Sequence, residues 1–245
     1  MKKLAIAGVV ILLLLAGGAW WAYSSLDFLV KTAIERYGPD ILGVPVKLGG
    51  IQISAQNGLG TLRELEIGNP AGYSTPRAVR VSNATLSVDP ATLTGDVVVV
   101  REISVVSPDI TYEIASNGKA NLDAIQKNIE GYLKRSGQQD ESGKPAAKAQ
   151  SAGRKFIFQR ISIRNARVQV TNPLLKGGGL SFTLPDIELR DLGKNSNGIT
   201  PSQAASIVTS TLVAKIALRA LSTGQLLQRG TEGAKDLLRG IFKTQ

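Results

Sequence analysis

The clearest pattern of apolar and polar positions in the chain begins at residue 97. Apolar residues dominate 97–106, and its odd-numbered positions are apolar apart from one arginine, whereas the even-numbered positions become polar in the middle. Side chains two residues apart share one face of a β-strand, so this segment reads as a strand. Ser107 and Pro108 interrupt it, because proline cannot donate to a ladder. Alternation resumes at 110–114, and Asn121 can then cap a helix.

The same arrangement of strand, kink and strand recurs at 155–172. Ile103 aligns with Ile161, and Ile110 aligns with Val168, without a gap. Such self-similarity predicts a repeated sheet unit. The alternative is that two β-rich segments resemble each other by composition alone.

Shorter alternating segments predict further strands on both sides of these two units. Their connections are short, so neighbouring strands are expected to pair antiparallel. The apolar parity switches at Ser82-Asn83 and again at Pro185. Each switch predicts a bulge or an edge position, and a bulge would bend its strand. The alternating segments that predict these further strands are 51–53, 65–67, 79–88 and 180–189.

Three segments carry the spacing of helices rather than strands. Apolar residues recur three and four positions apart in 26–42 and in 120–135. Thr200 and Pro201 open a third helical region, with Thr200 as cap and Pro201 at the first position. The tail to residue 245 is basic and amphipathic, so it predicts either a helix packed on the sheet or one lying on a membrane surface.

The N-terminus reads as a membrane anchor. Residues 4–22 form an uncharged apolar run of about the length that spans a bilayer as a helix. Lys2 and Lys3 precede it, which predicts a cytoplasmic N-terminus and a body on the other side of the membrane. Trp20 and Trp21 stand where an interfacial aromatic belt is expected. A cleaved signal peptide is the alternative interpretation.

Composition excludes several kinds of chemistry. The 245 residues include no cysteine and no histidine. Thiol catalysis, Cys/His zinc sites and Ser-His triads are therefore excluded. The net charge of +10 and the low aromatic content of 5% do not fit a single-strand nucleic-acid binder, which interleaves basic and aromatic residues. Attraction to anionic lipid is the better explanation, and a solvated basic surface is the alternative.

These observations predict an α+β protein that is mainly β. It would have an N-terminal transmembrane helix, a curved antiparallel β-sheet or groove with flanking helices, and a C-terminal helical tail. The predicted organisation is an anchor over 1–25, a helix and sheet segment over 26–135, a flexible linker over 136–154, a second β segment over 155–192, and amphipathic helices over 200–245.

An ordered series of short segments resembles a known family. The series comprises 41–46, 65–73, 97–110 and 118–122. Together with the N-terminal anchor they resemble the AsmA-like proteins, a bacterial envelope family related to the bridge-like β-groove lipid-transfer proteins. The resemblance covers most of 26–130, with a weaker echo in 155–215. It implies an inner-membrane protein with a periplasmic body, acting in phospholipid traffic or outer-membrane integrity.

Three functions from different classes follow from these patterns. The first is a membrane-anchored module that binds or handles phospholipid without breaking a bond. The second is a scaffold that binds an envelope protein by strand addition at a sheet edge. The third is a hydrolase built on Asp186, Glu188 and Asp191, although alternating charge is common on solvated strands. We expect the first function, with no catalytic residue, metal or cofactor and no nucleic-acid partner.

The predicted lipid contacts lie on the odd-numbered face of the central strand and continue beyond its kink. Core packing and lipid contact require the same residue types, so the pattern alone does not separate them. The predicted contact residues are Val97, Val99, Ile103, Val105, Ile110, Tyr112 and Ile114.

Overall fold

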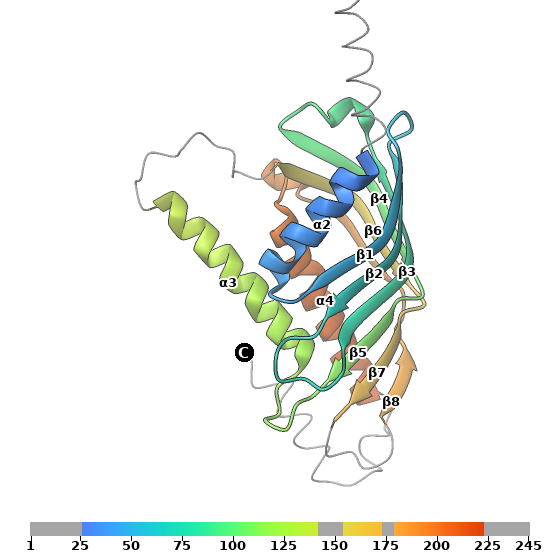
Figure 1. Ribbon diagram of the computed structural model, residues 1–245, viewed down its shortest axis with the longest axis vertical. Coiled ribbons are helices and arrows are strands. Elements are labelled where there is room, and N and C mark those ends of the chain that lie inside the picture. Colours follow the sequence, from blue (N-terminus) through green and yellow to red (C-terminus); the bar gives the residue numbers. More distant parts are fainter. Residues whose placement is uncertain (1–25, 142–153, 173–178, 223–245) are drawn as a thin grey trace, which may run out of the picture.

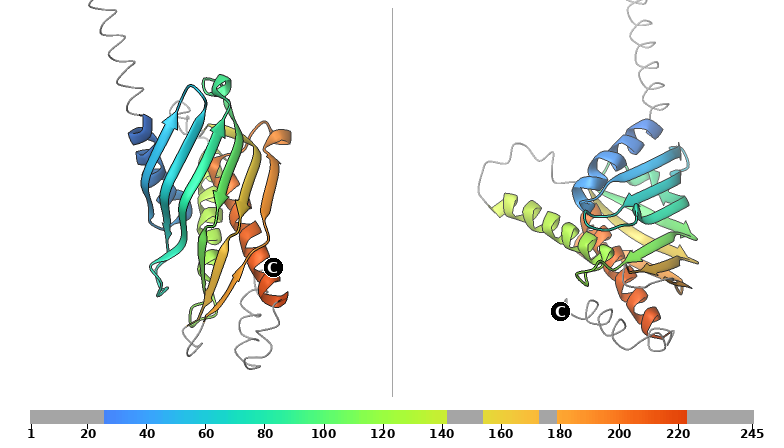
Figure 2. Two further views of the ribbon diagram at one scale, coloured as in Figure 1. Left: turned by 90° about the vertical axis from the view of Figure 1, so that its right-hand side faces the viewer. Right: turned by 60° about the horizontal axis from the view of Figure 1, so that its bottom comes forward.

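The computed structural model of the protein describes residues 26–141, 154–172 and 179–222. One open, curved sheet of nine strands carries three α-helices on one of its faces (Figures 1 and 2). The helices are α2 (Leu26–Leu42), α3 (Asn121–Glu141) and α4 (Pro201–Ser222). A mainly β fold with flanking helices is therefore confirmed for the described part of the chain.

The nine strands occupy six adjacent positions across the sheet, because three of these positions each hold two strands end to end. β3 pairs with β2 along one edge, and along the other edge it pairs first with β5 and then with β4. β4 and β6 are neighbours, as are β5 and β7, and the last position in the sheet holds β9 and β8. The strands are β1 (Val46–Ser54), β2 (Leu59–Gly68), β3 (Arg77–Val88), β4 (Val97–Val106), β5 (Asp109–Glu113), β6 (Lys155–Arg164), β7 (Arg167–Thr171), β8 (Leu180–Thr183) and β9 (Ile187–Leu192).

The two strand–kink–strand units predicted from the sequence lie side by side in this sheet. β4 pairs with β6, and Ile103 lies opposite Ile161. β5 pairs with β7, and Ile110 lies opposite Val168. The gapless sequence alignment thus reproduces the register of the sheet, and the repeated unit is confirmed.

Both of these pairings are parallel, which corrects the expectation of a purely antiparallel sheet. The helix α3 lies between the two units in the sequence and returns the chain to the end of the sheet where the first unit began. Parallel pairing requires a crossover of this kind, whereas the short connections elsewhere give antiparallel pairs. The segments predicted as 26–135 and 155–192 therefore share one sheet.

A transverse line of irregular backbone divides the sheet. Ser107 and Asn165, in the two kinks, have φ of 52° and 51°, and Glu64 in β2 has φ of 51°. Gly49 lies beside Glu64, where a Cβ would come within 2.9 Å of the Glu64 Cβ, so the position requires glycine. Irregular residues bend the strands that contain them. Because these residues are aligned across neighbouring strands, they curve the sheet as a whole.

We call the part of the sheet that contains β4, β6 and β9 the proximal half, and the part that contains β5, β7 and β8 the distal half. The first three strands cross both halves.

Val81 and Ala84 in β3 are both buried, which confirms the parity switch predicted between them.

The helix α2 covers the outer edge of β1. The backbone N–H of Leu48 donates to Glu35 Oε1 at 2.9 Å, and that of Ile53 donates to Asp27 Oδ1 at 2.8 Å. Carboxylates thus occupy donors that an unprotected edge strand would offer to another chain. The bond to Ile53 also places the first turn of α2 at the end of the proximal half.

A side-chain cap opens α4, whereas Asn121 is itself the first residue of α3 and its Oδ1 accepts from the backbone N–H of Leu122. Thr200 and Gln203 form a reciprocal capping box at the start of α4, as the predicted cap at Thr200 requires. The helix α3 begins at Asn121 and continues to Glu141, so it is longer than the predicted helix at 120–135 and includes the first residues of the predicted linker.

Several predictions lie outside the described residues, among them the anchor over 1–25 with Lys2, Lys3, Trp20 and Trp21. The same holds for most of the linker and for the tail beyond residue 222. Within the described ranges, none of the helices combines the length and the apolar character needed to cross a bilayer.

Candidate functional site

The helix-facing side of the proximal half consists of apolar residues in transverse rows. In one row, Leu86 lies opposite Gly60 on one side and Ile103 on the other, and Ile103 lies opposite Ile161. Directly opposite residues in neighbouring strands point to the same face. Each row is therefore a band of apolar side chains that crosses the sheet. The first row is Ile53, Gly60, Leu86, Ile103, Ile161 and Leu189, and the second is Ile51, Leu62, Ala84, Val105, Ile163 and Ile187.

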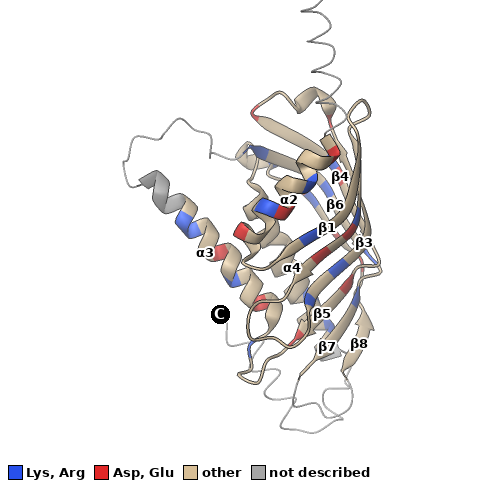
Figure 3. Ribbon diagram, in the orientation of Figure 1, with Lys and Arg blue, Asp and Glu red and all other residues tan. Residues whose placement is uncertain are grey.

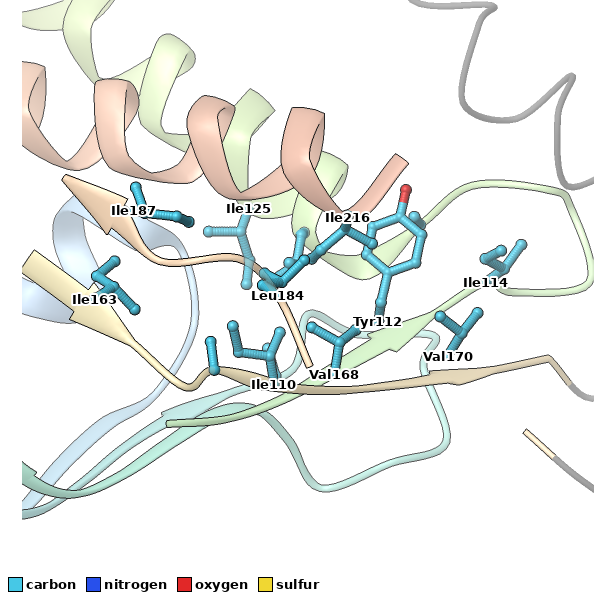
Figure 4. Packing of buried hydrophobic residues seen from close by; sticks show 14 of the residues in the cluster. Ile110, Tyr112, Ile114, Ile125, Ile163, Val168, Val170, Leu184, Ile187 and Ile216 are labelled. Carbon is cyan, nitrogen blue, oxygen red and sulfur yellow. The ribbon is translucent and has the colours of Figure 1, made fainter. Parts of the chain in front are cut away.

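The distal half of the same face is closed by helices. Ile110 and Tyr112 of β5 are each 2% exposed, under Ile125 of α3 and Ile216 of α4. Figure 4 shows these side chains between the strands and the two helices, with Val168 beside them. This region is a conventional hydrophobic core.

The proximal half is covered mainly at its two sides, although Ile163 and Ile187 next to the bend join the core of the distal half. At one side, Ala204 and Val208 of α4 contact the cluster that contains Phe158 and Ile161. At the other side, α2 lies against β1. Between these helices the rows remain partly exposed. We call this region the half-open surface, and it consists of Ile53, Leu62, Leu86, Ile103 and Phe156.

An aromatic pair bounds the half-open surface on β6. The rings of Phe156 and Phe158 are stacked with centroids 6.0 Å apart. Phe158 is buried and Phe156 is partly exposed. The pair therefore presents an apolar wall beside β4, where Phe156 lies opposite Val98 and Phe158 lies opposite Val100.

The predicted contact residues do not form one continuous face. The register between β3 and β4 shifts between Val100 and Glu102, so β4 changes parity there. Val98 and Val100 are buried on the helix-facing side, which places Val97 and Val99 on the opposite face. Ile103 and Val105 return to the helix-facing side, where both contact the core clusters.

The remaining predicted contacts, Ile110, Tyr112 and Ile114, belong to the closed core of the distal half. Of the seven residues proposed from the sequence, Ile103 alone lies on the half-open surface. The sequence analysis missed Ile53, Leu62, Leu86 and Phe156, because the pattern within one strand does not show which strands lie beside it. The alignment of Ile103 with Ile161 was the available signal, since it gives the register.

The opposite face of the sheet is polar. Arg160 Nε lies 3.1 Å from Glu188 Oε1, and Arg190 Nη2 lies 2.8 Å from the same oxygen. Glu102 extends this ladder to β4, 3.9 Å from Arg160. Figure 3 shows basic and acidic residues interspersed on the strands. The two faces of the sheet therefore differ in charge, since the ion pairs lie on the opposite face and the apolar rows lie on the helix-facing one.

The carboxylates considered for hydrolysis all take part in this outer layer. Glu188 is held by two arginines, Asp186 accepts a hydrogen bond from the backbone N–H of Asn165, and Asp191 Oδ1 lies 3.4 Å from Lys194 Nζ. They do not converge on one point. Among the described residues, no group of three or more acidic side chains is arranged to hold a metal ion.

A buried polar network joins the loop after β2 to β5 and α3. Glu113 is 2% exposed and accepts hydrogen bonds from the backbone N–H of Ser74 and of Thr75, the latter at 2.8 Å. Asn121 donates to Asn69 Oδ1 at 2.7 Å and accepts from the backbone N–H of Glu113 at 3.0 Å. This network explains why the segments at 65–73 and 118–122 occur together, and it gives them a structural role.

The pKa values in this network follow from burial and from hydrogen bonds. Burial alone would raise the pKa of Glu113, but the donors of Thr75 and Ser74 outweigh it and hold the pKa below its ordinary value. Burial raises the pKa of the nearby Asp123, against the hydrogen bond that it accepts from Tyr112. Burial also raises the pKa of Tyr112, with Asp123 adding to the effect.

A comparison with models of known protein families shows which family the chain belongs to. The model of the AsmA family matches residues 61–189, which is more than half of the chain. The chain belongs to the AsmA family. No curated protein matches it.

The AsmA match extends from β2 to β9, and it therefore includes both strand–kink–strand units and the buried network around Glu113. Four of the five residues of the half-open surface lie within the match, since only Ile53 precedes it. Membership of the AsmA family indicates a function related to the cell envelope.

Proposed function

We propose that this AsmA-family protein is a membrane-anchored lipid-binding module of the bacterial envelope, and that the half-open surface contacts the acyl chains of phospholipid. It would act in phospholipid traffic or outer-membrane integrity without breaking a bond. The observation that carries the proposal is the unequal cover of one apolar face, which is closed in the distal half and partly exposed between α2 and α4 in the proximal half.

The binding free energy expected from contact with an acyl chain is compatible with reversible binding. Each methylene buried from water contributes about 0.8 kcal/mol. Contact with five methylenes would therefore contribute about 4 kcal/mol, which corresponds to a dissociation constant near the millimolar range. A longer contact along the rows would strengthen binding in proportion, and release would remain possible.

The test compares a charge on the half-open surface with a charge on the polar face. Leu86→Asp should leave the protein folded and abolish co-purifying phospholipid, because water reaches a partly exposed position once lipid leaves. Val106→Asp is the matched control, since Val106 is 47% exposed at the end of β4. Native mass spectrometry of the detergent-released full chain measures the lipid, and circular dichroism measures the fold.

Two results would contradict the proposal. One is a wild-type protein that carries no lipid, and the other is a folded Leu86→Asp protein that retains as much lipid as the wild type. Leu86→Ser removes apolar contact without adding charge, so it replaces Leu86→Asp if the aspartate unfolds the protein.

We also propose that the protein is a single-pass inner-membrane protein with its body in the periplasm. The support is the apolar run at 4–22 after Lys2 and Lys3. Protease added to spheroplasts should digest the body. A body that is protected until the inner membrane is lysed would reverse this orientation.

A second candidate function is protein binding at one edge of the sheet. The helix α2 occupies the edge of β1, whereas no described strand pairs with the outer edge of β8 and β9. Strand addition at that edge would recruit an envelope protein. Photo-crosslinking in cells from position 190 should then capture a protein that position 47 on β1 does not, and equal capture from both positions would argue against it.

A further inference from the structure

Three of the large apolar side chains that the structure leaves exposed lie at one end of the molecule. Phe28 and Leu29 in the first turns of α2 are 69% and 52% exposed, and Leu59 at the start of β2 is 50% exposed. The hydrogen bond from Ile53 to Asp27 joins the two elements, because Ile53 lies next to the turn that leads to Leu59. The start of α2 and the turn between β1 and β2 both lie at the upper end of the molecule in Figure 1.

These residues contribute nothing to the core. Phe28, Leu29 and Leu59 belong to neither hydrophobic cluster, and each exposes at least half of its surface to water. Large apolar side chains that are exposed at one end of a molecule commonly mark a contact with a membrane or a protein.

The position in the chain favours a membrane. Only three residues separate the apolar run at 4–22 from Leu26, where α2 begins. Trp20, Trp21 and Tyr23 occupy the junction, and aromatic residues are enriched where a chain leaves the bilayer. The proposed anchor, if it ended there, would hold the first turn of α2 against the bilayer surface.

We infer that this end of the molecule, formed by Phe28, Leu29 and Leu59, rests on the surface of the lipid bilayer. The inference builds on the proposed function, because the half-open surface opens in the same half of the sheet. Ile53 belongs to that surface and is bonded to the first turn of α2. Lipid would then pass from the bilayer to the rows without crossing water.

The absence of cysteine from the chain makes the test direct. Single cysteines are introduced as Phe28→Cys, Leu59→Cys and Leu218→Cys, labelled with the fluorophore NBD, and studied in the full chain. The proteins are reconstituted into vesicles of phosphatidylethanolamine and phosphatidylglycerol, with and without brominated acyl chains. Leu218 is the matched control, because it is 64% exposed but lies near the C-terminal end of α4 rather than beside α2.

We expect brominated lipid to quench NBD at positions 28 and 59 at least twofold more than at position 218. Position 59 decides the matter, because position 28 is close to the anchor in sequence whereas position 59 reaches the membrane only through the fold. Quenching at 59 no greater than at 218 would overturn the inference. A blue-shifted NBD spectrum at 59 without quenching by bromine would overturn it as well, since a protein would then cover the position.

The result is separable from the proposed function. Native mass spectrometry of the unlabelled protein reports bound lipid independently of quenching. Quenching at 28 and 59 in a protein that carries no lipid would uphold the membrane contact and refute lipid binding. Bound lipid without quenching at 59 would do the reverse.

Discussion

Ser107 and Asn165 occupy equivalent positions in two neighbouring units of the sheet, and both have a left-handed backbone. They are 58 residues apart, as are Ile103 and Ile161, which lie opposite each other in β4 and β6. The backbone N–H of Ser107 donates to the carbonyl oxygen of Arg164 at 2.8 Å, so the two kinks are joined. Adjacent strands therefore bend at the same level, and this bend separates the closed core from the half-open surface.

The left-handed backbone at the kink predicts which substitutions the bend tolerates. Ser107→Val should lower the free energy of unfolding by about 1–2 kcal/mol, because a β-branched side chain is strained at positive φ. Ser162→Val is the control, since residue 162 lies in regular β6, where valine is favoured. Urea denaturation of both variants measures the difference, and an equal effect of the two substitutions would contradict the structural role of the kink.

The buried network predicts a large cost for removing one carboxylate. Glu113→Ala should lower the free energy of unfolding by about 1–3 kcal/mol, because it leaves the partly buried N–H groups of Ser74 and Thr75 without their acceptor. Chemical denaturation checks the value. Glu130→Ala is a suitable control on the exposed side of α3 and should change stability little.

The same carboxylate predicts a dependence of stability on pH. The folded pKa of Glu113 lies below its ordinary value of 4.5, so its contribution is complete above that pH and is lost as the pH falls through the folded pKa. The stability difference between wild type and Glu113→Gln should therefore shrink below about pH 4.5. Asp123, whose pKa is raised, acts in the opposite direction but is present in both proteins. Melting temperatures between pH 3 and 7 test this, and a difference that grows on acidification would contradict it.

The cover of the β1 edge predicts a local change in protection. Glu35→Ala should speed hydrogen exchange at the backbone N–H of Leu48, because Glu35 is its acceptor. Exchange at Ile53, whose acceptor is Asp27, should remain slow and provides the internal control. Unchanged exchange at Leu48 would show that the carboxylate does not protect this edge.

The sequence predicted what depends on local pattern. Alternation located both units, and the alignment of Ile103 with Ile161 matches the register of β4 and β6. The switch between Val81 and Ala84 and the cap at Thr200 were also visible, because each depends on residues close in the chain.

What the sequence did not predict depends on residues distant in the chain. The parallel direction of β4 and β6 follows from the crossover through α3, which no single strand records. The register shift at Arg101, in the pairing of β4 with β3, places Val97 and Val99 on the polar face and not on the face of Ile103. The half-open surface itself arises from where α2 and α4 lie, and apolar patterning is the same for a covered and an open row.

The most direct test of lipid contact is photo-crosslinking with a phospholipid that carries a diazirine in its acyl chain, reconstituted with the full-length protein and mapped by peptide mass spectrometry. We expect adducts on Leu62, Leu86, Ile103 and Phe156, and none on the closed core at Tyr112 or on the polar face at Val106. Adducts confined to Val106 and its neighbours, or none on the described strands, would contradict it.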